Sequence, residues 1–176
     1  MESRLFLSPV TAEDVEFLAD IKMDADLWAY EDFIPTDREA VINEIFEHLD
    51  GRWYKDYLIR LNDPEKTPVG ELHLHWYVGE RKSWELGYGL FPAYRGQGYC
   101  LEAAQIAMKW AFEEFQAHKV IAMCNACNHR SSHVMDKLGM KLEGRFREEL
   151  PWQGKWVDQL FFCILEDEYR ELTKRS

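Results

Sequence analysis

A short apolar segment broken by two glycines leads through a glycine-rich turn into a helical pattern, and this junction restricts the folds open to the chain. Segment 83–91 reads SWELGYGLF, and the turn after it contains Arg95, Gly96, Gln97 and Gly98. Apolar residues at helical spacing follow from Leu101 onward. Glycines inside a strand indicate a bulge or the close approach of another group. The chain therefore needs a fold in which an irregular strand runs directly into a helix.

Hydrophobic periodicity predicts the other elements. Strands are expected at 4–7, 53–61, 69–78, 83–91 and 119–124, with a closing hairpin formed by 141–150 and 155–165. Helices are expected after capping patterns at Thr11 and Thr36, after the glycine turn, and at 129–139 with Gly139 as the terminating residue. Segment 23–35 has no clean periodicity and is expected to be a loop. This order predicts a single domain over residues 1–176, of the α/β (α+β) class, with a mixed sheet and helices on both faces.

The charge and hydropathy of the chain limit its partners. It carries 21 basic and 32 acidic residues, a net charge of −11, which argues against nucleic acid as the main partner and suits cationic partners such as amines. No apolar run approaches the roughly 20 residues that cross a bilayer. The N-terminal stretch lacks the apolar segment of a signal peptide, so no membrane association and a cytoplasmic location are expected. Four cysteines in a chain of this size indicate a reducing compartment more than a disulfide framework.

The turn at 95–98 is a candidate anion-binding site. It places backbone N–H groups at a helix N-terminus, where unpaired donors and the helix dipole attract anions, and Arg95 adds a positive charge. Glycine lets a ligand approach the backbone closely. No Walker A motif is present, and Leu101 stands where the dinucleotide fingerprint needs its third glycine. On pattern alone, the alternative is an ordinary helix entry that contains glycine.

Motifs elsewhere in the chain extend this pattern. Arg95 and Gly98, with Cys100 at a position for a small residue, match an R/Q-x-x-G-x-G/A signature, and Asn128, Ser131 and Leu138-Gly139 match a second motif. With the segments 3–21, 84–103 and 151–165, these motifs resemble the GNAT superfamily of N-acetyltransferases over nearly the whole chain. The likeness is greatest to the branch of ribosomal-protein N-terminal acetyltransferases, the RimJ/RimL type. It implies a mostly antiparallel central sheet with a splayed central strand.

The resemblance also implies acetyl-CoA as cosubstrate, without a metal. The pyrophosphate would lie on the turn and the helix start, the pantetheine arm would follow the central strand, and amides near Tyr88 to Leu90 would polarise the thioester. The implied CoA-binding residues are Tyr88, Gly89, Leu90, Arg95, Gly96, Gln97, Gly98, Tyr99, Cys100, Asn128 and Ser131. A zinc site made of Cys124, Cys127, His129 and His133 is not expected, because the two pairs lie too close together for a zinc finger.

Acetyl transfer to an amine needs a base for the amine proton and a proton donor for the leaving thiolate. Glu85 on the central strand is the candidate base, acting through a water, and Glu71 on the neighbouring strand is its rival. Either residue could instead be a strand carboxylate that faces solvent. Ser131 is the candidate donor to the sulfur and Asn128 a contact of the CoA arm, although both residues also suit helix capping.

The acceptor is predicted to be a primary amine, such as a protein N-terminus, a polyamine or another small amine. Trp28, Tyr30 and Glu31 from the acidic, aromatic loop would contact it, with Glu71 beside them and Trp152 completing the wall, because carboxylates and aromatic rings suit a cation. The alternative is an ordinary solvated loop whose aromatic side chains pack beneath it, with Trp152 serving only in packing. Many relatives carry a large aromatic residue where Gly89 stands, so a wider acceptor side is expected. The alternative function is a CoA-binding or partner-binding module with weak catalysis. A monomer or a homodimer is expected.

Overall fold

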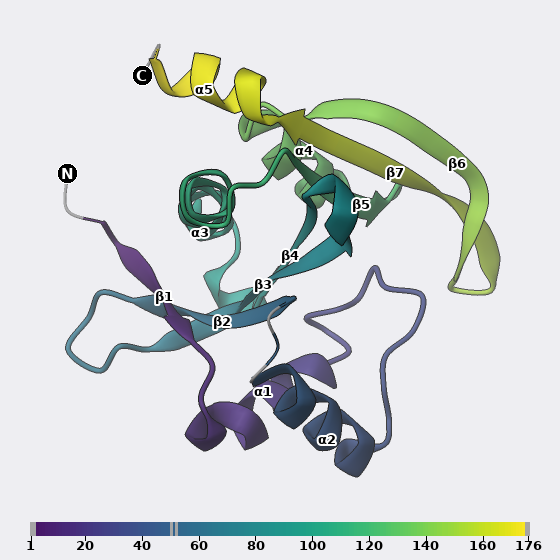
Figure 1. Cartoon of the computed structure of the whole chain (residues 1–176). Helices are drawn as coiled ribbons and strands as arrows, with labels where there is room; N and C mark the ends of the chain where they lie inside the picture. The colour runs from purple at the N-terminus through teal and green to yellow at the C-terminus, as the bar shows by residue number, and fades with distance from the viewer. Residues whose placement is uncertain (1–2, 50, 52, 175–176) are drawn as a thin grey trace.

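The structure of the protein is a computed structural model that describes residues 3–49, 51 and 53–174 (Figure 1). Its strands are β1 (Leu5–Pro9), β2 (Tyr54–Leu61), β3 (Pro68–Val78), β4 (Ser83–Leu90), β5 (Lys119–Asn125), β6 (Lys141–Trp152) and β7 (Lys155–Leu165). Its α-helices are α1 (Val15–Lys22), α2 (Arg38–Leu49), α3 (Tyr99–Lys109), α4 (His129–Lys137) and α5 (Glu166–Lys174). A π-helical turn, Trp110–Glu114, continues α3.

The seven strands form one mixed sheet with the order β1-β2-β3-β4-β5-β7-β6. Every neighbouring pair is antiparallel except β4 and β5, which run parallel. Their pairing covers only three residue pairs and ends with Glu85 opposite Ile121. Beyond that point the two strands diverge, so the sheet is open at its centre, as expected for a splayed central strand.

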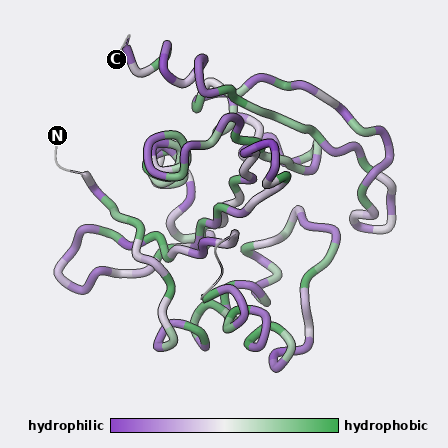
Figure 2. The backbone as a smooth tube through the Cα atoms, viewed as in Figure 1, coloured by the Kyte–Doolittle hydropathy of each residue, from purple (hydrophilic) through white to green (hydrophobic). Residues whose placement is uncertain are grey.

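Helices cover both faces of this sheet. Helix α3 packs on one face through Ala103, Ala104, Ala107 and Met108, in the larger hydrophobic core. Helices α1 and α2 pack on the opposite face in a second core that includes Leu58 of β2. Figure 1 shows the two layers, with α1 and α2 on one side of the strands and α3 on the other, while Figure 2 shows hydrophobic residues concentrated on the strands between them. The sheet therefore lies between two apolar layers.

Local sequence signals start and stop several elements as expected. The Asp14 carboxylate accepts hydrogen bonds from the backbone N–H and the hydroxyl of Thr11, at 3.0 and 2.8 Å, and so closes the turn before α1. The Asn128 side chain accepts a bond from the Ser131 N–H at the start of α4. Gly139 follows α4 with φ of +79°, a conformation that glycine adopts without strain.

Two expectations about helices are wrong. Helix α2 is capped by Asp37 in place of Thr36, since the Asp37 carboxylate accepts the Ala40 N–H at 3.1 Å. Helix α5 was not expected, because its nine residues are mostly polar and none is buried (Figure 2). It is held by one local contact and one contact to a distant segment. The Glu168 carboxylate accepts the Leu165 N–H at 3.0 Å, and Tyr169 stacks on Phe112.

Across the described ranges 3–49, 51 and 53–174, no helix has the length and apolar character needed to span a membrane.

Candidate active site

Strand β4 presents different side chains to the two layers. Trp84, Leu86 and Leu90 are buried in the core that contains α3, and Tyr88 packs against it. Gly87 and Gly89 face the other layer: a Cβ on Gly87 would meet the His73 ring, and one on Gly89 would meet Leu27. Both glycines are therefore required by side chains that lie across the strand. The register shift between β3 and β4 lies at Trp76/Val78, away from both glycines, so the expected bulge is not at them.

The turn before α3 has the geometry of an anion-binding site. Gly96 and Gly98 have φ of +76° and +83°, which side-chain-bearing residues rarely adopt, and nothing lies within 4 Å of the position where a Gly96 Cβ would be. Within the described part of the chain, the amides of Gly96, Gln97 and Gly98 donate no hydrogen bond to protein. Helix α3 begins at Tyr99, directly after these amides. Free donors at a helix N-terminus suit a phosphate group.

Arg95 lies beside this turn, but its side chain contacts backbone carbonyls. Its Nε donates to the Leu90 carbonyl at 3.0 Å, and its Nη2 donates to the carbonyls of Asp26 and Leu27 at 2.8 and 3.2 Å. These bonds tie the end of β4 to the loop between α1 and α2. Arg95 thus positions the acidic loop relative to the central strand, and its charge remains close to the turn.

A hydroxyl pair lies on the α3 side of the opening. The Tyr88 hydroxyl is 3.3 Å from the Ser131 Oγ, and Ser131 follows the Asn128 cap at the start of α4. Burial raises the pKa of Tyr88, so the phenol stays protonated at neutral pH. Burial also raises the pKa of Cys100 to about 12 and that of Cys124 to about 11, which keeps both thiols neutral. The hydroxyl pair of Tyr88 and Ser131 can donate protons to a group that enters between β4 and β5.

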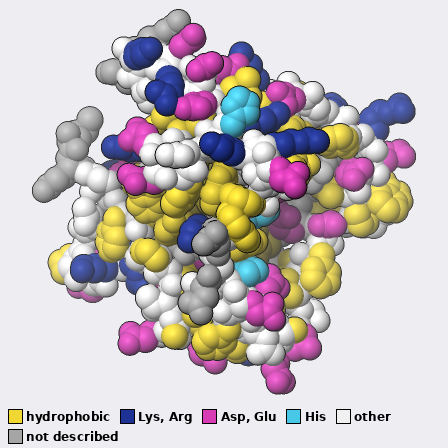
Figure 3. Space-filling view, viewed as in Figure 1, with side chains coloured by type: hydrophobic (Ala, Val, Ile, Leu, Met, Phe, Trp, Pro, Cys, Tyr) yellow, Lys and Arg dark blue, Asp and Glu magenta, His cyan; other side chains and the backbone are white. Residues whose placement is uncertain are grey.

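Ionisable side chains line the opposite side of the opening. The Glu85 Oε2 lies 3.3 Å from the His75 Nε2, and about a fifth of the Glu85 side chain is exposed. Glu31 is an exposed residue of the loop, but protein atoms around its carboxyl group raise its pKa, and the charges of Asp32 and Glu85 act in the same direction. Glu31 and Glu85 can therefore attract a cation to this side of the opening and accept a proton from it. Acidic side chains also surround the hydrophobic area at the centre of the face shown in Figure 3.

The loop between α1 and α2 is fastened across the opening by aromatic and amide contacts. Asn125 of β5 donates to the Tyr30 carbonyl at 3.2 Å, and the Trp152 indole donates to the Ala29 carbonyl at 2.9 Å. Tyr30 and Trp152 stack with ring centroids 5.4 Å apart. Trp152 therefore contacts the loop, as a residue completing its wall would. Together these contacts join the loop to β5 and to the end of β6, on the β5 side of the opening.

The expectation that Gly89 widens the acceptor side is wrong. A Cβ on Gly89 would lie 2.3 Å from the Leu27 Cδ2 and 2.9 Å from the Trp28 Cη2. Trp28 is held there by a hydrogen bond from its indole to the Ile21 carbonyl at 2.9 Å. Side chains of the loop thus fill the space that an aromatic residue on the strand would occupy.

Glu71 lies behind this surface in a buried charged cluster. Its side chain is 2% exposed; Oε2 is 3.6 Å from the Lys22 Nζ and Oε1 is 3.6 Å from the His73 Nδ1. The Lys22 Nζ is also 3.5 Å from the Asp56 Oδ1. Burial alone would raise the pKa of both carboxyl groups, but Lys22 and the neighbouring histidines outweigh it and lower them. The cluster is charged at neutral pH, and Glu71 is buried and paired with Lys22 in it.

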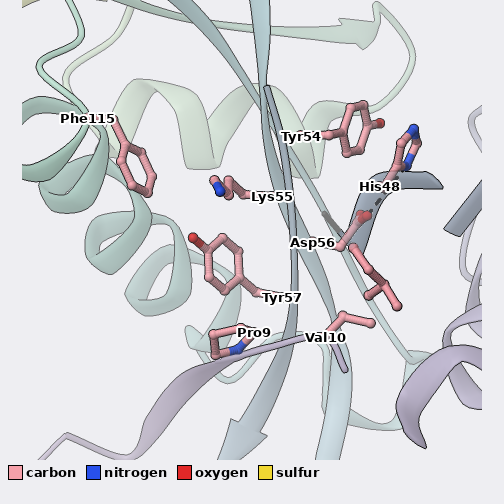
Figure 4. A pocket seen from close by; sticks show the side chains of 9 residues that line it. Pro9, Val10, His48, Tyr54, Lys55, Asp56, Tyr57 and Phe115 are labelled. Atoms are coloured by element: carbon pink, nitrogen blue, oxygen red, sulfur yellow. Dashed lines mark ion pairs between the residues drawn. The ribbon is translucent and has the colours of Figure 1, made fainter. Parts of the chain in front are cut away.

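The same cluster is the candidate metal group among the described residues. Asp56, Glu71 and His73 have ligand atoms within 4.8 Å of one another. Lys22, however, already places an ammonium ion against both carboxylates. From the strand edge the cluster is reached by a pocket of about 260 Å³ (Figure 4), in which His48 approaches Asp56 with its Nδ1 3.6 Å from Oδ2. This pocket lies where β1 ends at Pro9, on the far side of β2 from β4.

Sequence patterns did not single out Lys22, Asp56 or Arg4. Lys22 ends α1 and Asp56 sits in a strand whose alternation is otherwise ordinary, so their meeting depends on the packing of α1 over β2 and β3. Arg4 contacts the glycine turn from 93 residues away in sequence. For Asp56 one signal was available in the sequence. It is a charged residue at a strand position whose side chain is expected to face the core, two residues before Leu58.

Comparison with known proteins agrees with this architecture. The model of the family "Acetyltransferase (GNAT) domain" matches residues 4–141. The uncharacterized N-acetyltransferase YnaD of Bacillus subtilis is 36% identical over 105 residues, which span 60% of this chain and 61% of that protein. The spermidine N(1)-acetyltransferase of Escherichia coli is 23% identical over 164 residues, 93% of this chain and 87% of that protein.

A solved structure shares the fold over almost the full length of both chains. It is the spermidine N-acetyltransferase of Vibrio cholerae in complex with CoA and spermine, with a TM-score of 0.84, 19% identity, and coverage of 96% of this chain and 99% of that one. The family model covers well over half of the chain, and the splayed strand and the glycine turn stand where the family motifs predicted them. The chain therefore belongs to the GNAT family of acetyltransferases.

Proposed function

We propose that the protein transfers an acetyl group from acetyl-CoA to a primary amine of a small polycation, by direct attack of the amine on the thioester. The observation that carries this proposal is the acidic surface beside the open end of β4, where the charges of Asp32 and Glu85 both act on the Glu31 carboxyl group. An acidic wall attracts an ammonium ion and raises its local concentration. The relative from Escherichia coli is named a spermidine acetyltransferase, which supports this class of acceptor.

The donor would bind across the glycine turn and the opening between β4 and β5. The amides of Gly96, Gln97 and Gly98 are free to bind its pyrophosphate, and the unpaired edge of β4 beyond Glu85 is free to bind its pantetheine amides. The related fold from Vibrio cholerae has been solved with CoA, in support of this placement. The acetyl thioester supplies the reactive carbonyl. The backbone and the side chains of this protein supply the other requirements.

Two proton transfers complete the reaction. The acceptor amine, with an ordinary pKa of about 10, must lose a proton before it attacks, and Glu85 is the group placed to receive it through a water. The leaving sulfur must gain a proton or a hydrogen bond. Ser131 is the donor, with the Tyr88 hydroxyl 3.3 Å away to replace the proton. The nitrogen loses a second proton as the amide forms, and this proton restores the hydroxyl pair through solvent, so that one proton is released for each acetyl group transferred. The carboxylate and the hydroxyl pair lie on opposite faces of β4, so base and acid do not neutralise each other.

A protein N-terminus is the second candidate acceptor, in keeping with the resemblance to the RimJ/RimL branch. The contacts of Tyr30 and Trp152 hold the loop against the β5 side of the opening, which supports a slender amine over a folded protein surface as the acceptor. A panel of amines distinguishes the two. We expect release of CoA thiol with spermidine-like polyamines to exceed release with short peptides that have a free α-amine. Preference for the peptides would assign the protein to N-terminal acetylation, and CoA binding with no turnover would leave only a binding module.

Substitution of Gly98 tests the donor site. Gly98→Asp should weaken CoA binding by about tenfold or more, because a carboxylate would enter the turn that receives the pyrophosphate. Gly154→Asp is the matched control: Gly154 lies in the β6–β7 turn with φ of +73°, and like Gly96 it has open space around its Cβ position. The affinity for CoA is measured by calorimetry. Equal losses in the two variants would show that backbone strain, and not the anion site, causes the effect.

A further inference from the structure

The peptide group that joins Gln97 to Gly98 is fixed in direction by Arg4, just before β1. The Arg4 Nη1 donates to the Gln97 carbonyl at 3.0 Å. A trans peptide places its C=O and N–H on opposite sides, and the described residues contain no cis peptide. The Gly98 N–H therefore points away from Arg4, to the opposite side of the turn. This is one of the three amides that make no hydrogen bond to the described protein.

The same guanidinium neutralises an acidic residue in the first turns of α3. The Arg4 Nε and Nη2 each lie 2.9 Å from the Glu102 Oε2, and the Arg4 backbone N–H donates to Oε1 at 2.8 Å. Partial burial alone would raise the pKa of Glu102, but the hydrogen bonds from Arg4 outweigh it and lower that pKa. Glu102 is thus a carboxylate at neutral pH, one turn from the free amides. Without a counter-charge it would repel any phosphate there.

Arg4 is held in this position by a third contact. Its guanidinium carbon lies 4.9 Å from the centroid of the Tyr99 ring, and its Nη2 is 3.4 Å from the position of a Gly98 Cβ. All three nitrogens of the guanidinium are thus used on the turn and on α3. A lysine could not make these contacts at once, because its single ammonium lacks the planar fork of arginine.

We propose that Arg4 is a positioning residue of the donor site: it turns the Gly98 amide toward the phosphates and removes the repulsion of Glu102. Arg4 thereby acts through the turn and α3, without contact to the reacting atoms. This inference rests on the proposed function, since it requires CoA phosphates on the turn. It adds a residue that lies outside the family signature at 95–100.

The test measures KM for acetyl-CoA, KM for the amine and kcat in Arg4→Gln, Arg4→Lys and the double variant Arg4→Gln/Glu102→Gln. Arg4→Gln should raise KM for acetyl-CoA and the Kd for CoA about tenfold, with kcat and the amine KM within about twofold of wild type. The double variant should recover at least about threefold of this loss, because the unpaired carboxylate is gone. The KM for acetyl-CoA of Arg4→Lys should lie between those of Arg4→Gln and the double variant. Arg170→Gln, which removes the partner of Glu166 on α5, is the matched control and should change none of these constants.

Different outcomes overturn different statements. Wild-type protein that binds no CoA would overturn the proposed function and this inference together. Wild-type binding that is retained unchanged in Arg4→Gln would overturn the inference alone. A double variant as weak as Arg4→Gln would overturn the neutralising role of Arg4. If Arg4→Gln does not fold, Arg4→Lys decides the question: it keeps the charge, and wild-type affinity in it would show that the fork on Gln97 and Glu102 is unnecessary.

Discussion

The Glu85→Gln variant is expected to lose about 10²–10⁴-fold in kcat while it binds CoA as tightly as the wild type. Glutamine keeps the size of the side chain and a contact to His75, but it cannot take a proton from the amine. Steady-state kinetics and calorimetry on the same preparation measure the two quantities. The loss should be greatest where most of the amine is protonated, and should shrink as the pH rises toward the amine pKa of about 10.

Glu80→Gln is the control for this substitution, since Glu80 is an exposed carboxylate in the turn before β4. Its kcat should stay within about twofold of wild type. Glu71→Gln separates the two candidate bases, because Glu71 is buried against Lys22 and should affect stability more than turnover. A loss in Glu71→Gln that matches that of Glu85→Gln, in protein of wild-type stability, would contradict the assignment of Glu85.

The Lys22→Met variant is expected to lose about 3–5 kcal/mol of unfolding free energy at pH 7. Methionine fills similar space but leaves Asp56 and Glu71 as buried carboxylates without their ammonium partner. Urea unfolding at pH 7 measures this loss. Lys141→Met is the control, because Lys141 pairs with Glu168 on an exposed surface, where ion pairs contribute about 0–1 kcal/mol.

The unfolding free energy of Lys22→Met should change with pH in the opposite direction to the contribution that the charged cluster makes in the wild type. In the wild type the pKa values of Asp56 and Glu71 are lowered, so their contribution is full above about pH 4 and is lost as the pH falls through the lowered values. Without Lys22, burial raises these pKa values above those of the unfolded chain, and the folded state binds protons more readily. The variant should therefore gain stability from pH 7 to pH 5, and a flat profile would contradict the account.

Elements that depend on local signals could be predicted from the sequence. Thr11 with Asp14, Asn128 with Ser131, and Gly139 each set a helix boundary through contacts within three residues. The strands followed from alternation, and the positive φ angles of Gly96 and Gly98 from a turn that only glycine adopts easily. The open centre of the sheet could not be derived from periodicity. It came from the resemblance to the family, and the short β4–β5 pairing agrees with it.

Contacts between distant segments could not be predicted. The sequence indicated only that Arg95 supplies a positive charge to the ligand. Its hydrogen bonds to the carbonyls of Asp26 and Leu27 depend on the loop lying against β4, which no local pattern indicates. The absence of a side chain at Gly89 was interpreted as extra space on the acceptor side, because the sequence does not show that Leu27 and Trp28 cover this position. Helix α5 lacks an apolar period. The bond from the Leu165 N–H to Glu168 at its start is local, but the stacking of Tyr169 on Phe112 joins distant segments.

The mass of the amine product tests the central claim most directly. Release of CoA thiol alone also arises from hydrolysis of acetyl-CoA, whereas an acetylated amine arises only from transfer. Wild-type protein with acetyl-CoA and a polyamine should yield the amine with one added acetyl group on a primary nitrogen, and Glu85→Gln should yield almost none at equal CoA occupancy. Thiol release without any acetylated amine, across polyamines and peptides alike, would contradict the account.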